Sequence, residues 1–76
     1  MRRSVIESLS RIGDPRRAGA VETFLDDPAW SVRRAALEAL ERLDPAMAEE
    51  AAGRRIDGEA DPLVLEVMRR VLRVRA

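Results

Sequence analysis

The stretch from Asp26 to Asp44, DDPAWSVRRAALEALERLD, predicts the element that decides the fold. It opens on Asp27-Pro28, a pair that favours a helix start because aspartate caps free backbone N–H groups and proline is preorganised for the first turn. Its apolar residues fall on one face of a helix and do not alternate as in a strand. They are Val32, Ala35, Ala36, Leu37, Ala39, Leu40 and Leu43. We therefore predict a helix over residues 29–43.

The same apolar pattern recurs at a spacing of 31 residues, once before and once after this helix. Five columns align without gaps, and every member of each column is apolar. The columns are Met1, Val32 and Leu63; Val5, Ala36 and Val67; Ile6, Leu37 and Met68; Leu9, Leu40 and Val71; and Ile12, Leu43 and Val74. Recurrence of one helical unit at a fixed spacing is the signature of a repeat protein, so we expect three similar helices.

Asp-Pro pairs also divide the rest of the chain. They are Asp14-Pro15, Asp27-Pro28, Asp44-Pro45 and Asp61-Pro62. Each pair opens a helical segment, and short segments alternate with long ones. The predicted helices span residues 2–12, 16–25, 29–43, 46–56 and 62–74. Helices joined by tight turns pack as hairpins, so we predict an all-α fold, a short α-solenoid (superhelix) of stacked antiparallel helix hairpins.

Length and composition exclude several classes of protein. At 76 residues the chain is one small domain or a piece of a larger array, which excludes a multi-domain enzyme. It contains no Cys and no His, so it lacks a thiol nucleophile, an imidazole base and the usual zinc ligands, and it has no glycine-rich phosphate loop. We therefore expect a non-enzymatic protein with no catalytic residue, no cofactor and no metal.

Charge and hydropathy bear on the partners and the location. Fourteen arginines balance 14 acidic residues, and this formal net charge of zero argues against the broad basic field of a nucleic-acid-binding domain. No apolar run is long enough to cross a membrane, and polar residues interrupt any signal core near the N-terminus. We expect a cytoplasmic protein with no membrane partner.

The helix at residues 29–43 and the turn before it resemble a HEAT repeat, especially the short bacterial and archaeal kind named for phycobilisome lyases. The pairs that carry the resemblance are Asp27-Pro28, Val32-Arg33, Ala35-Ala36 and Ala39-Leu40. The resemblance implies about two and a half HEAT-like repeats in a single domain over residues 1–76: a partial repeat at 1–13, a complete repeat at 14–44 and a last repeat at 45–76. It also implies a scaffold or adaptor for protein–protein interaction.

Arg33 falls inside the apolar arc of its helix, where an unpaired guanidinium would be costly. It therefore needs a carboxylate, and Asp27, at the entrance to the helix, is the expected partner in a structural ion pair. The resemblance implies a ladder in which this arginine bridges the capping carboxylates of neighbouring turns. A ligand-binding role for Arg33 stays open, because perturbed buried charges also mark functional sites.

In the family the long helices line the concave surface of the solenoid, so the resemblance implies a partner-binding face there. The candidates are Trp30, Arg34, Glu38, Glu41, Arg11, Arg42 and Arg73. Tryptophan and arginine dominate interface hot spots, which favours a protein partner. A boundary tryptophan on a solvated, salt-bridged surface is the plainer alternative. A nucleic-acid-binding module that uses the arginine column (Arg11, Arg42 and Arg73) is another.

The predicted helix at residues 62–74 is apolar over a wide arc, unlike a terminal repeat that faces water. Val64 stands where the central copy has Arg33, and Leu72 stands where it has Glu41. We expect this face to be covered, by a homodimer contact or by docking to a larger assembly. The oligomer-interface candidates are Val64, Leu65, Met68, Leu72, Val5 and Leu9. The chain as a separately encoded end fragment of a longer solenoid is the remaining alternative.

Overall fold

The structure is a computed structural model that describes Ile6 and residues 15–75. Its elements, in chain order, are η1 Pro15–Arg17, α2 Ala18–Glu22, η2 Thr23–Asp26, α3 Trp30–Leu43, α4 Pro45–Arg55, η3 Ile56–Gly58 and α5 Pro62–Arg75. The described part of the chain contains no strand, so the predicted all-α class is confirmed. The predicted helix at residues 2–12 lies outside the described residues except for Ile6, which is buried.

Aspartate side chains cap the starts of α4 and α5, as the Asp-Pro pairs predict. The Asp44 carboxylate accepts a hydrogen bond from the Met47 backbone N–H at 3.1 Å, with Pro45 in the first turn of α4. The Asp61 carboxylate accepts from the N–H groups of Leu63 at 2.8 Å and Val64 at 3.2 Å, at the start of α5. These bonds satisfy donors that have no partner within the helix.

The predicted helix at residues 16–25 is present as a continuous helical segment from Pro15 to Asp26, but it is not α-helical throughout. Only α2, five residues long, is α-helical, and tighter 3-10 turns precede and follow it. The Thr23 hydroxyl donates to the Ala20 carbonyl at 2.7 Å, three residues back. That local bond suits a 3-10 turn and competes with regular α-helical geometry.

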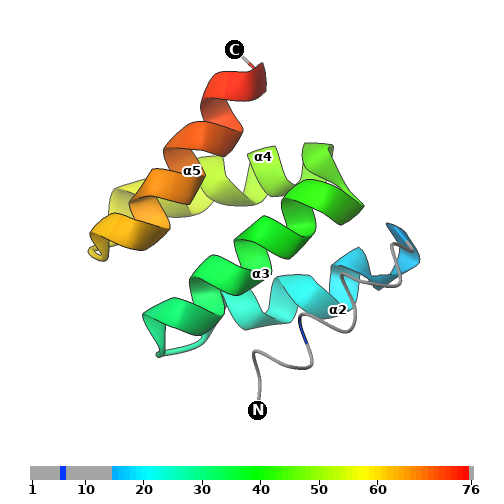
Figure 1. The fold of residues 1–76 in the computed structure, drawn as a ribbon, viewed down its shortest axis with the longest axis horizontal. Coiled ribbons are helices and arrows are strands. Elements are labelled where there is room, and N and C mark those ends of the chain that lie inside the picture. The colour runs from blue at the N-terminus through cyan, green and yellow to red at the C-terminus, as the bar shows by residue number, and fades with distance from the viewer. Residues whose placement is uncertain (1–5, 7–14, 76) are drawn as a thin grey trace.

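The elements form two layers (Figure 1). Helices α3 and α5 run side by side in the same direction, and α2 and α4 lie behind them. Helix α3 is the centre of the arrangement, because it packs against α2, η2, α4 and α5. The succession of α2 with α3 and of α4 with α5 is compatible with a short α-solenoid of stacked hairpins.

The core lies between these layers and is closely packed by aliphatic side chains. Leu37 and Leu40 of α3 are almost fully buried, and so are Val64 and Val67 of α5. Helix α4 contributes only alanines to the fully buried set: Ala48, Ala51 and Ala52. Small side chains let α4 approach its neighbours closely, which compensates for the modest apolar area that each alanine buries.

The wide apolar arc of α5 is covered mainly by the chain itself. Val64 and Met68 were predicted at an oligomer interface, but they are only 1% and 3% exposed. The reason is that α5 packs against both α3 and α4, so two helices share its apolar arc. Leu65 and Leu72 are half-buried and pack on the core. The other two interface candidates, Val5 and Leu9, lie outside the described residues.

Candidate functional site

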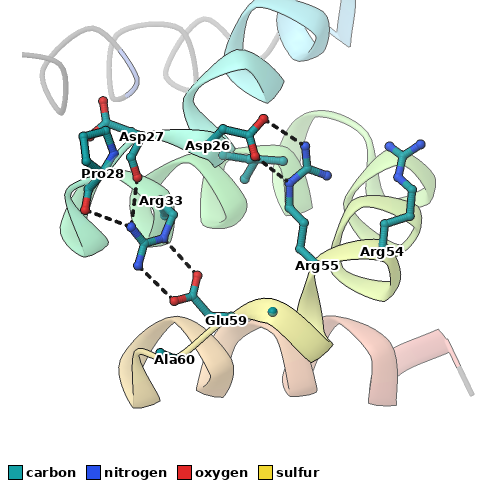
Figure 2. A pocket seen from close by; sticks show the side chains of 10 residues that line it. Asp26, Asp27, Pro28, Arg33, Arg54, Arg55, Glu59 and Ala60 are labelled. Atoms are coloured by element: carbon teal, nitrogen blue, oxygen red, sulfur yellow. Dashed lines mark hydrogen bonds and ion pairs between the residues drawn. The ribbon is translucent and has the colours of Figure 1, made fainter.

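Arg33 joins the turn before α3 to the turn before α5 (Figure 2). Its Nε and Nη2 atoms donate to the two carboxylate oxygens of Glu59, both at 2.9 Å. Its Nη1 atom donates to the backbone carbonyls of Asp27 at 2.9 Å and Pro28 at 3.0 Å. A guanidinium that holds a carboxylate with two parallel bonds has both strength and fixed geometry. We refer to this arrangement as the Arg33–Glu59 clasp.

The clasp shifts the pKa values of both of its charged groups. The Glu59 side chain is only 6% exposed, and its Oε2 atom also accepts from the Asp61 backbone N–H at 3.0 Å. The hydrogen bond from Arg33 is the main reason that the pKa of Glu59 lies below its ordinary value, although burial acts in the opposite direction. The same bond raises the pKa of Arg33. Glu59 is therefore ionised in the folded chain at neutral pH.

The sequence pointed to Asp27 as the carboxylate partner of Arg33, whereas the structure places Glu59 against the guanidinium. Asp27 offers Arg33 its backbone carbonyl, and its carboxylate accepts from the Ala29 N–H at 2.9 Å. Arg33 itself is half-buried, with its side chain 21% exposed. The signal that was missed is the position of Glu59, two residues before the Asp61-Pro62 pair of the next turn.

A pocket of about 550 Å³ lies beside the clasp, between the turns of the two hairpins. Its charged lining consists of Asp26, Asp27, Arg33, Arg54, Arg55 and Glu59. Arg55 Nε lies 3.4 Å from an Asp26 carboxylate oxygen. Arg54 lies 3.5 Å from Glu22 and 3.4 Å from Glu50. Each arginine of the pocket therefore has a carboxylate neighbour, an arrangement that ties elements together.

Helices α3 and α5 are also joined across their outer surface by ion pairs. Arg34 Nη2 lies 3.3 Å from Glu66 Oε1. Arg70 Nη2 lies 2.7 Å from Glu41 Oε1 and 3.9 Å from Glu38 Oε2. The hydrogen bond that Arg70 donates to Glu41 is the main reason that the pKa of Arg70 is raised. Two of the pairs join residues 32 and 29 positions apart, so the helices lie parallel and close to the 31-residue register of the sequence.

The two ends of this surface differ in character. Trp30 and Leu63, in the first turns of α3 and α5, are 42% and 41% exposed, and they are the exposed large hydrophobic residues of the described chain. Arg42 and Arg73 lie near the carboxyl ends of the same helices and are exposed. We call the whole surface, with its apolar end, its ion-paired middle and its basic end, the α3–α5 face.

The α3–α5 face contains all the partner-binding candidates that the structure describes: Trp30, Arg34, Glu38, Glu41, Arg42 and Arg73. Arg11 lies outside the described residues. Sequence reasoning missed Leu63, Glu66 and Arg70 on this face. Leu63 occupies the column of the buried Val32, so its column alone predicted burial. Glu66 and Arg70 lie 32 positions after Arg34 and Glu38, so opposite charges at this spacing could have identified them.

The described residues contain neither a membrane-spanning helix nor a metal-binding cluster of side chains. None of their helices is both long enough and apolar enough to cross a membrane. They also contain no group of three or more His, Cys, Asp or Glu side chains placed to hold a metal ion.

Comparison with known protein families gives a match to part of the chain. Residues 19–47 match the HEAT repeat family, and the match spans most of α2, all of η2 and α3, and the start of α4. The curated proteins and the solved structures that were compared contain no match to the chain. The matched segment is one helical hairpin with the turn that holds Asp27 and Pro28. It supports a HEAT-like repeat protein.

Proposed function

We propose that the chain is a non-enzymatic adaptor that binds another protein through the α3–α5 face. HEAT repeats generally mediate protein–protein interaction. The observation that carries the proposal is the exposure of Trp30 and Leu63 at one end of a face whose middle is fixed by ion pairs. An exposed tryptophan on this surface suits a protein partner, because tryptophan is enriched among residues that contribute most to binding.

The acidic side chains of the same face disfavour the nucleic-acid alternative. Three glutamates lie between the apolar and basic ends and form ion pairs with Arg34 and Arg70. They are Glu38, Glu41 and Glu66. A phosphate backbone lying along the face would meet these carboxylates and be repelled. A protein surface is able to match both the apolar end and the mixed charges.

Site-specific photo-crosslinking tests the proposal. A photoreactive amino acid replaces Trp30 or Leu63, and the matched control carries it at Glu50, an exposed position of α4 in the other layer. In extracts of the cells that encode the chain, we expect one protein to be crosslinked from positions 30 and 63, with excess unlabelled chain abolishing the product. Equal crosslinking from position 50, or none from positions 30 and 63, would contradict the proposal.

The remaining expectations extend this proposal. We propose a cytoplasmic location, repeats of the phycobilisome-lyase kind, and one domain over residues 1–76 with repeat boundaries after residues 13 and 44. We also propose self-association through the accessible parts of Leu65 and Leu72. Sedimentation velocity tests this last point, and a monomer at micromolar concentration would count against it.

A further inference from the structure

The two ends of the α3–α5 face lie at matching levels along two parallel helices. Because the register between the helices is close to 31 residues, Trp30 and Leu63 differ by only two residues, or about 3 Å of helix rise. Arg42 and Arg73 are 31 residues apart and therefore lie level. The apolar end and the basic end are separated by 12 residues of α3, which is about 18 Å.

The exposed apolar side chains lie at one end of the face, and two exposed arginines lie at the other. In the middle, Arg34 is paired with Glu66, and Arg70 is paired with Glu41. Among the residues that the structure describes, no carboxylate lies within ion-pair distance of Arg42 or Arg73. A partner therefore gains most by covering the apolar end and by bringing negative charge to the basic end.

We infer that the partner is an acidic segment of another protein, an inference that rests on the proposed function. An apolar side chain of this segment packs on Trp30 and Leu63. Carboxylates about 18 Å further along it pair with Arg42 and Arg73. The direction of the segment is fixed, because the reversed orientation would place carboxylates on the apolar end and leave both arginines unmatched.

Synthetic peptides provide a direct test. Each is a helical peptide of about 16 residues, since 18 Å corresponds to about 12 residues of helix. The first has two leucines in its first turn, alanines along the docking side and two glutamates in its last turn. The second has lysines in place of the glutamates, and the third has serines in place of the leucines. Anisotropy of the labelled peptide reports binding, and the fluorescence of Trp30, the only tryptophan, reports contact with the apolar end.

We expect the glutamate peptide to bind at least about tenfold more tightly than the lysine peptide at low salt, and this preference to shrink as salt is added. The fluorescence emission of Trp30 shifts to the blue when the first peptide, with leucines and glutamates, binds. It stays unchanged with the third peptide, in which serines replace the leucines. The double variant Arg42→Glu with Arg73→Glu reverses the preference, so that the lysine peptide binds better. The matched control, Arg17→Glu, changes another exposed arginine on η1 and leaves the preference intact.

Three outcomes would overturn the inference. They are no binding of any peptide, equal binding of the glutamate and lysine peptides, or a preference that survives both arginine reversals. A labelled DNA duplex that binds more tightly than the glutamate peptide and dissociates with added salt would also overturn it, in favour of nucleic acid. If the peptides fail but crosslinking from positions 30 and 63 captures a protein, the acidic partner is wrong and the adaptor function stands. If neither experiment gives binding, both fail.

Discussion

Arg33 and Glu59 depend on each other unequally. The Glu59 side chain is almost fully buried, so its negative charge is stabilised mainly by the guanidinium of Arg33. If the carboxylate is lost, Arg33 still donates to two backbone carbonyls and is partly exposed to water. Removing one partner of a buried ion pair leaves the other charge buried without compensation, and the free-energy cost of this exceeds the net contribution of the intact pair to stability. The clasp therefore acts mainly by fixing how the two hairpins meet.

Replacing Arg33 with alanine should destabilise the chain by about 2–3 kcal/mol, because it strands the ionised Glu59 carboxylate. The matched control is Arg54→Ala, which removes an arginine from exposed ion pairs and should cost less than about 1 kcal/mol. Urea unfolding of both variants gives the two free energies. Equal losses would show that the clasp has no special role.

The clasp should also make stability depend on pH. The pKa of Glu59 is lower in the folded chain than in the unfolded chain, so the unfolded chain binds more protons and stability rises with pH. The contribution is complete at neutral pH, and it is lost as the pH falls through the ordinary glutamate pKa and then through the folded value. We expect wild type to exceed Glu59→Gln by about 1–2 kcal/mol at neutral pH. Urea unfolding across this range should show the difference shrinking in acid, and a constant difference would contradict the account.

At the scale of elements, the buried residues of α4 are all alanines, and Gly53 lies in its interior. A Cβ atom at this position would meet only Leu72 Cδ2, at 4.0 Å, which is ordinary van der Waals contact. Gly53→Ala should therefore stabilise the chain by about 0.5–1 kcal/mol, because alanine restricts the unfolded backbone. Thermal unfolding measures the gain. Gly58→Ala, outside the helix interior, should gain less, and destabilisation by Gly53→Ala would refute the packing of α4 on α5.

Sequence patterns predicted α3, α4 and α5 well because local signals specify each of them. The Asp-Pro pairs fix the starts of α4 and α5, and the apolar spacing fixes the inward face of α3. The segment before α3 was predicted less well, since the Thr23 hydroxyl bond and the 3-10 turns depend on local geometry.

Features that depend on packing were the hardest to predict. Val64 stands in the column of Arg33, yet it enters the core because two helices cover that side of α5. Glu59 lies in an irregular segment, where periodicity gives no information about the direction of a side chain. The candidate face was found through its recurring residues, while its ion-pair partners on α5 required the tertiary register.

At the scale of the whole molecule, the central position of α3 predicts cooperative unfolding. Leu40 is fully buried, and α3 contacts α2, α4 and α5. Leu40→Ala should cost about 3–5 kcal/mol, a large part of the total stability expected for a chain of this size. Circular dichroism and Trp30 fluorescence should give the same, lower midpoint in urea. Exposed Leu63→Ala should cost less than about 1 kcal/mol, and separate transitions for the two probes would contradict a single cooperative unit.

The central claim is that α3 and α5 lie parallel and in register, so that they form one face. The chain contains no cysteine, so spin labels can be attached at introduced pairs without interference. Neighbouring parallel helices are about 8–10 Å apart, which makes the pairs 30/63 and 42/73 shorter than the diagonals 30/73 and 42/63 by about 10 Å. Distances measured by electron paramagnetic resonance should follow this order. Diagonals equal to or shorter than the lateral pairs would show that the helices do not share a register and that the proposed face does not exist.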